Sequence, residues 1–122
     1  MTREVKFRAY DSATGKVSEP FDVKESWGDY LIDFGDYSAD GASDSIIWEQ
    51  YTGLKDKNGK EIYEGDVLVD DCGEPLEYWA IKYEHGKFVG ETQGVIEDVY
   101  ELADLEVIGN VHENPELLGG EE

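Results

Sequence analysis

Short segments in which hydrophobic and polar residues alternate recur along the chain, and this period of two predicts β-strands that bury one face. Residues 5–10 alternate in this way, and the turn-forming residues 11–16 predict a hairpin that returns through Val17. A second strand is expected over Trp27–Phe34, whereas the polar, glycine-containing residues 35–44 are expected to form a loop. The first third of the chain is therefore predicted to be β-rich.

The central segment carries the clearest strand and turn signals. Ser45–Thr52 is rich in β-branched and aromatic residues, which is typical of a buried strand. Asn58 and Gly59 both tolerate a positive φ angle, and this pair predicts a hairpin whose second strand passes through Ile62 and Tyr63. Further strands are predicted at residues 67–69, 78–83 and 88–89, with turns at 71–75 and 84–87.

The last third of the chain has a less regular pattern. Val95–Leu105 fits either an irregular strand or a short acidic helix, and we favour mostly strand. Glu106–His112 is expected to be a closing strand. Asn114 is a good N-cap residue and Pro115 suits a first helical position, so a single helical turn is predicted at the C-terminal end.

Six to nine short strands without a long helical pattern predict a mainly β fold, small and barrel-like, with a short C-terminal helical turn. Residues 1–122 are expected to form a single domain. Within this domain, residues 1–60 and residues 61–118 could each form a lobe. Within the second half, the strand, turn and strand of residues 65–89 suggest a small SH3-like barrel by analogy of pattern.

Chain length and composition narrow the setting. A chain of 122 residues can bury one core. It has neither an apolar stretch of about 20 residues nor an N-terminal secretory signal, so we expect a cytoplasmic protein without membrane contact. Cys72 is the only cysteine, which excludes an intrachain disulfide and fits a reducing compartment.

Acidic residues dominate the charge. The formal net charge is −20, and residues 61–122, with 18 acidic and 2 basic residues, carry −16 of it. Direct binding of nucleic acid needs clustered lysine and arginine and is disfavoured, and a basic host or phage protein is the expected partner. The residues expected to form an acidic partner-binding face are Asp66, Asp70, Asp71, Glu74, Glu77, Glu97, Asp98, Glu101 and Asp104.

Three segments, residues 3–11, 50–68 and 106–118, resemble the opening, central and closing signatures of the YopX family, in the same order. The resemblance implies a protein encoded by a phage or prophage, with a β-rich fold and no established biochemical activity. It brings no catalytic residues and no cofactor. The glycines and apolar residues of the signatures suggest a structural role, and Lys55, Lys57 and Lys60 are expected at a solvated hairpin tip.

Two acidic segments contain carboxylates at spacings that a metal site could use. Asp36, Ser38, Asp40 and Asp44 have the spacing of a calcium loop, but Ile47 stands where a bidentate glutamate is needed, so a surface loop without metal is favoured. The carboxylates of Asp66, Asp70, Asp71 and Glu74 could serve metal-assisted hydrolysis, but no basic residue accompanies them to hold a phosphate.

Three functions follow in order of preference. The first is an acidic accessory protein that binds another protein and is not an enzyme. The second is a DNA mimic that inhibits a host nucleic-acid enzyme of the restriction or CRISPR type, because the second half holds as much charge as about eight base pairs of DNA. The third and weakest is a metal-dependent hydrolase.

Overall fold

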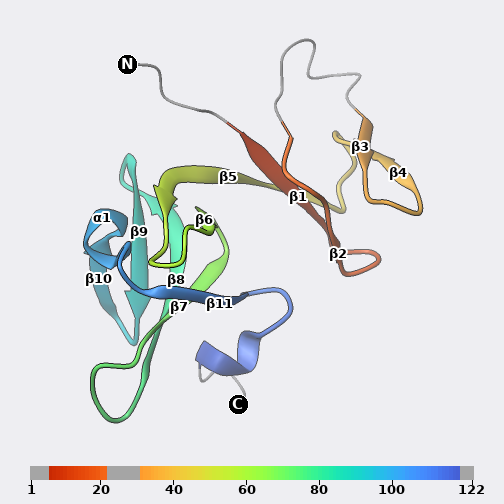
Figure 1. Cartoon of the computed structure of the whole chain (residues 1–122). Coiled ribbons are helices and arrows are strands. Elements are labelled where there is room, and N and C mark those ends of the chain that lie inside the picture. The colour runs from red at the N-terminus through yellow and green to blue at the C-terminus, as the bar shows by residue number, and fades with distance from the viewer. Residues whose placement is uncertain (1–5, 22–30, 119–122) are drawn as a thin grey trace. The chain divides into compact units, whose positions relative to one another are not determined.

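The computed structural model describes residues 6–21 and 31–118, and these residues form a mainly β structure, as predicted (Figure 1). The chain divides into two compact units, Met1–Tyr51 and Thr52–Glu122. The described residues contain eleven strands, more than the six to nine expected, because several strands are only two or three residues long. No helix within the described ranges has the length and apolar character that crossing a bilayer requires.

The first unit is built on β1 (Phe7–Asp11), which pairs antiparallel with β2 (Lys16–Val17) on one side and with the first part of β5 (Ile46–Lys55) on the other. Asp11 is paired with Lys16 across the predicted hairpin, which is confirmed. Thr52, the last residue of the predicted strand Ser45–Thr52, and three further residues continue β5 into the second unit.

A separate hairpin of β3 (Leu31–Asp33) and β4 (Ser38–Asp40) completes the first unit. The prediction of a loop throughout residues 35–44 is therefore wrong at β4. Serine, alanine and aspartate have low strand propensity, and this strand exists through its pairing with β3. Of the strand predicted over Trp27–Phe34, residues 27–30 lie outside the described residues.

The core of the first unit combines buried aliphatic residues with aromatic contacts. Its buried members are Ala9, Ile32, Phe34 and Ile46. The ring of Trp48 packs against them, with its indole N–H donating to a backbone carbonyl, and it makes edge-to-face contacts with two phenylalanine rings at centroid distances of 5.7 and 5.4 Å. The alternation that predicted these strands thus corresponds to real burial.

The second unit is a five-stranded antiparallel sheet in the order β10-β9-β8-β7-β11. Four consecutive strands form a meander, a helical turn follows, and the last strand returns to pair with the first, which is the strand order of an SH3-like barrel. The bounds are β6 Glu61–Tyr63, β7 Asp66–Asp70, β8 Glu77–Glu84, β9 Lys87–Thr92, β10 Val95–Asp98, α1 Val99–Leu102, β11 Glu106–Asn110 and the 3-10 helix η1 Pro115–Leu118.

The segment Val95–Leu105 is neither mostly strand nor mostly helix, because the two structures follow one another as β10 and α1. Leu102 of α1 lies against the sheet above Gly90, where an added Cβ atom would lie only 2.3 Å from the Leu102 side chain. Glycine at this position therefore lets α1 pack closely on β9. Trp79 and Ile81 of β8 are the large buried residues beneath it.

The closing segment forms a strand, a turn and a helical turn, as predicted. Asn110 ends β11, and its side-chain oxygen accepts hydrogen bonds from the N–H groups of His112 and Glu113. The side-chain oxygen of Asn114 in turn accepts from the N–H of Asn110. These amide side chains replace backbone partners in the turn, and η1 follows from Pro115.

Candidate functional site

The carboxylates expected to form one acidic face divide into two groups. Because neighbouring strands are antiparallel, the β7–β8 loop and the end of β10 lie at opposite ends of the five-stranded sheet, and Figure 1 shows them apart. The set therefore does not gather in one cluster, and its role in partner binding stays a prediction. The loop group consists of Asp70, Asp71, Glu74 and Glu77, and the second group consists of Glu97, Asp98, Glu101 and Asp104.

Asp66 belongs to neither group and was wrongly assigned to a surface. It is 1% exposed, and its side-chain oxygen accepts a hydrogen bond of 2.8 Å from the N–H of Tyr63. Between these residues Gly65 has a φ angle of 88°, which suits the tight turn from β6 into β7. Asp66 therefore stabilises the turn of the central signature instead of meeting a partner.

The candidate calcium loop does not gather its side chains. Asp36 pairs with Lys16 at 3.4 Å, and the Asp40 carboxylate accepts from the N–H of Ala42 at the end of β4. Within residues 6–21 and 31–118, no three histidine, cysteine, aspartate or glutamate side chains come together as metal ligands. Asp44 is not part of such a group either, and the described residues give no support to a metal site in this loop.

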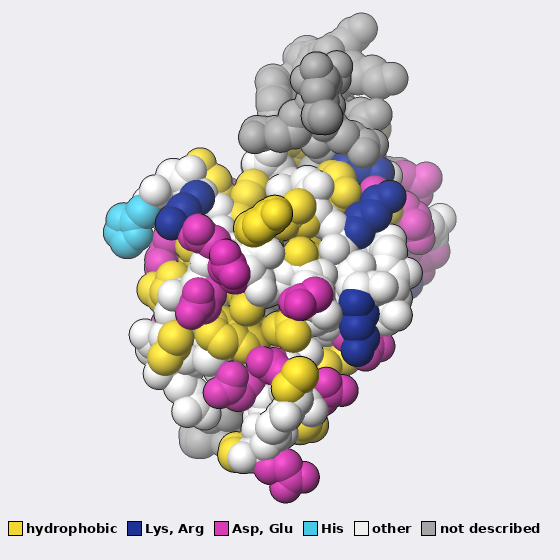
Figure 2. All heavy atoms as spheres, turned by 60° about the vertical axis from the view of Figure 1, so that its left-hand side comes forward, with side chains coloured by type: hydrophobic (Ala, Val, Ile, Leu, Met, Phe, Trp, Pro, Cys, Tyr) yellow, Lys and Arg dark blue, Asp and Glu magenta, His cyan; other side chains and the backbone are white. Residues whose placement is uncertain are grey.

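The edge strand β10 and the helical turn α1 expose apolar and acidic side chains on both faces of the strand, and we call this region the β10–α1 surface. Its apolar members are Val95, Ile96 and Tyr100, whose exposed fractions are 51%, 49% and 76%. Its acidic members are Glu97, Asp98 and Glu101, all exposed. Figure 2, which brings this side of the molecule forward, shows hydrophobic side chains with carboxylates around them.

The charges on the β10–α1 surface are mostly unneutralised. Asp98 pairs with Lys87 at 2.6 Å, in the neighbouring strand. The pKa of Lys82 is raised by its hydrogen bond to the Glu91 carboxylate on the same sheet, with Glu84 also near. In the described part of the chain, no basic side chain pairs with the other two carboxylates of the surface.

Sequence patterns missed the apolar half of this surface. Val95 and Ile96 are adjacent, and in a strand adjacent side chains point to opposite faces, so the pattern alone does not indicate that both are exposed. Both are exposed in β10, which is the last strand of the sheet. Only the strand order, which the sequence does not reveal, could have identified them.

At the opposite end of the strand order, β11 is covered by the Asn-Gly hairpin. The Asp56 carboxylate accepts hydrogen bonds from the N–H groups of Asn58 and Lys60 within the hairpin and from that of Val107 in β11, at 2.8 to 2.9 Å. Burial acts to raise the pKa of Asp56, but these three backbone donors outweigh it and lower the pKa overall. Asp56 thus ties the central signature to the closing strand.

A second buried carboxylate stabilises the first unit. The Asp11 carboxylate accepts hydrogen bonds from the Tyr37 hydroxyl at 2.8 Å and from the Ala13 N–H at 2.9 Å, and these bonds lower its pKa. Burial raises the pKa of Tyr37. The bond from Tyr37 connects the β1–β2 turn to the β3–β4 hairpin, so this carboxylate also has a structural role.

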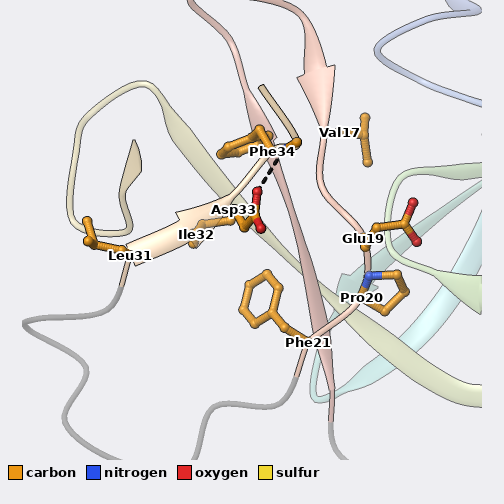
Figure 3. Close-up of a pocket in the computed structure, with 9 residues that line it drawn as sticks. Val17, Glu19, Pro20, Phe21, Leu31, Ile32, Asp33 and Phe34 are labelled. Atoms are coloured by element: carbon orange, nitrogen blue, oxygen red, sulfur yellow. Dashed lines mark hydrogen bonds between the residues drawn. The ribbon is translucent and has the colours of Figure 1, made fainter. Parts of the chain in front are cut away.

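The first unit contains a hollow of about 320 Å³ beside β3 (Figure 3). Phe21 and Ile32 contribute apolar walls, and Asp33 supplies a carboxylate. That carboxylate already accepts a hydrogen bond of 2.8 Å from the Gly35 N–H, so it does not form part of a convergent polar set of the kind found in ligand sites. The residues that line the hollow therefore do not indicate a particular class of ligand.

Comparisons with known proteins agree with the fold. The family model described as YopX protein matches residues 6–119. A solved structure, protein EF1440 from Enterococcus faecalis, is similar over 96% of this chain and 99% of its own length, with 31% sequence identity and a TM-score of 0.65. No curated protein matches the chain significantly.

Proposed function

The chain belongs to the YopX family, and from this premise we propose that it is an accessory protein that binds a basic protein partner through the β10–α1 surface and catalyses no reaction. The family resemblance implies a phage or prophage setting, in which the partner is a host or phage protein. The buried carboxylates Asp11, Asp56 and Asp66 support a role without catalysis, because each accepts hydrogen bonds within a turn.

The observation that carries this proposal is the combination of exposed apolar and acidic groups on one short segment. Protein interfaces place apolar and aromatic side chains at their centre and polar groups at the rim. Tyr100 is an aromatic residue with most of its surface exposed, and Val95 and Ile96 lie in the adjoining strand. Glu97 and Glu101, which pair with no lysine among residues 6–21 and 31–118, favour a partner with lysine or arginine opposite them.

The β7–β8 loop is the alternative surface, since it also presents carboxylates and one exposed leucine, Leu76. It offers a single large apolar residue, whereas the β10–α1 surface offers three. The loop is therefore the weaker candidate. The DNA-mimic hypothesis stays a prediction.

Site-specific photocrosslinking tests the proposal. The photoreactive residue p-benzoylphenylalanine replaces Tyr100 in one variant and Ile108 in a matched control, because Ile108 is also an exposed apolar residue of the second unit but lies in β11. Both variants are expressed in a bacterial host and irradiated. We expect a discrete crosslinked protein of basic composition at position 100 and little product at position 108.

The salt dependence of the crosslinking yield is the second part of the test. The crosslinked yield at position 100 should fall when the irradiation is repeated in lysate at 0.5 M salt, because exposed charges are screened over a few ångströms at that ionic strength. Equal crosslinking at both positions, or a yield that salt leaves unchanged, contradicts the proposal. A product only from the β7–β8 loop, with the probe at Leu76, would move the binding surface to that loop.

A further inference from the structure

The outer edge of β10 has a defined hydrogen-bonding pattern. Gln93 and Gly94, with φ angles of 48° and 88°, form the two-residue turn between β9 and β10, and Val95 lies opposite Thr92. In such a hairpin the residues flanking the turn direct their backbone groups at each other, and the direction then alternates along the strand. The N–H and C=O groups of Ile96 therefore point away from β9, towards the open edge.

The same alternation governs Asp98, two residues further on, while Val95 and Glu97 direct their backbone groups to β9. No further strand pairs with β10 anywhere in residues 6–21 and 31–118. The fold thus presents a short stretch of open backbone, and the side chains beside it are apolar in the first half of β10 and acidic in the second half.

We propose that an extended segment of the partner adds to this edge as an antiparallel strand, with two basic residues followed by two apolar residues opposite β10. This inference rests on the proposed binding function and specifies its mode. Running antiparallel, the partner places its basic residues opposite Asp98 and Glu97 and its apolar residues opposite Ile96 and Val95. Each face of β10 then has one charge pair and one apolar pair.

Charge complementarity selects this occupant over a second copy of the chain. Two antiparallel copies of β10 would bring Glu97 and Asp98 together with the same residues or with the apolar positions of the other copy. Like charges placed close together across strands are destabilising. The formal charge of −20 adds a general repulsion between copies. A basic segment avoids both the like-charge contacts across the strands and the general repulsion between acidic chains.

A matched set of peptides tests strand addition on the full chain. The parent peptide, blocked at both ends, is Thr-Thr-Lys-Arg-Val-Ile-Thr-Thr. In the proposed register its Lys and Val direct their N–H groups at β10, whereas Arg and Ile direct theirs outwards. One derivative is N-methylated at Lys and Val, and its control is N-methylated at Arg and Ile. All three have the same side chains and the same charge.

Amide chemical shifts of the ¹⁵N-labelled protein give the affinity and the location. We expect the parent to shift the amides of β10 and to slow the hydrogen exchange of the Ile96 N–H. Methylation at Lys and Val should weaken binding about tenfold, because two backbone hydrogen bonds are lost, and methylation at Arg and Ile should weaken it less than twofold. A scrambled peptide with the core Lys-Val-Arg-Ile should also bind less tightly.

Protein variants provide the reciprocal test. Ile96→Ala removes the apolar contact, and Ile96→Pro removes in addition the N–H that points to the edge. The Pro variant should bind the parent peptide at least threefold more weakly than the Ala variant. Retained binding with equal effects of both methylation patterns would overturn strand addition while leaving the proposed function in place. No binding of the parent at millimolar concentration would also overturn strand addition, whereas the crosslinking experiment decides the proposed function independently.

Discussion

The two edge strands of the second-unit sheet differ in whether other residues hydrogen-bond to their outer backbone groups. At the β11 edge, the Asp56 carboxylate accepts from the N–H of Val107, and the carbonyl of Leu105 just before the strand accepts from the N–H of Lys57. At the β10 edge, the described residues provide no such cover. One edge is closed by the central signature of the family, and the other is left available.

This difference separates two uses of acidic side chains. At β11 the carboxylate is buried and its oxygens accept from backbone donors, so it stabilises the fold. At β10 the carboxylates of Glu97 and Asp98 are exposed beside open backbone. Charged residues on an edge strand discourage pairing with identical chains, and the same charges admit a strand of opposite charge. Acidic side chains thus stabilise the fold at the β11 edge, whereas at the β10 edge they select which strands can pair.

Removing the carboxylate at the closed edge should have the largest effect. Asp56→Ala leaves three backbone N–H groups without their acceptor, and we expect a loss of about 3 kcal/mol in the free energy of unfolding. Urea denaturation followed by tryptophan fluorescence measures it. A loss below about 0.5 kcal/mol, the range of ordinary surface substitutions, would mean that the Asn-Gly hairpin does not hold the β11 edge.

Proline substitutions at adjacent positions of β10 should differ in cost, because only one of the two N–H groups faces the neighbouring strand. Val95→Pro removes an N–H directed at β9 and should cost about 3 kcal/mol. Ile96→Pro removes an N–H that faces the open edge and should cost clearly less than Val95→Pro. Denaturation of both variants checks the order. Equal losses would contradict the assigned direction of the edge groups.

The closed edge should also weaken in acid. The pKa of Asp56 is lowered in the folded state, so its stabilising contribution is present above the ordinary carboxyl pKa of about 3.8 and is lost as the pH falls through the lower folded value. Between pH 6 and pH 2.5 the wild-type protein should therefore lose more stability than Asp56→Asn. Parallel curves for the two proteins would show that Asp56 does not contribute to the acid sensitivity.

Neutralising the open edge should change the fold least. Glu97→Gln with Glu101→Gln should alter the free energy of unfolding by less than about 0.5 kcal/mol, since both side chains are exposed. The double variant should nevertheless self-associate more readily in sedimentation, because like-charge repulsion at the edge is reduced. Glu74→Gln with Glu77→Gln, in the β7–β8 loop and at the start of β8, is the matched control and should remain unchanged in both measurements.

Much of the fold could be predicted from the sequence because its signals are local. Asn58-Gly59 specified the β5–β6 hairpin, and Asn114-Pro115 specified the helical turn at η1. β4 was missed because Ser38–Asp40 has no strand signal of its own and depends on pairing with β3. The split of Val95–Leu105 into strand and helix was missed because the alternation is broken there by exposure at the sheet edge.

The candidate site was predictable only in part. The acidic residues Glu97, Asp98 and Glu101 were identified from composition, and all three are exposed in the adjoining elements β10 and α1. Asp66 was not distinguishable from them, because a carboxylate in a turn and one on a surface look alike in a sequence. The exposed apolar partners became visible only once the strand order placed β10 at the end of the sheet.

Hydrogen–deuterium exchange of the full chain, alone and bound to the partner captured at Tyr100, tests the central claim that binding occurs at the open edge. The account predicts slower exchange on binding across β10 and α1, most of all at the Ile96 N–H, with little change in the β7–β8 loop and in the Asn-Gly hairpin. Protection confined to the β7–β8 loop, or unchanged exchange across β10, would contradict it.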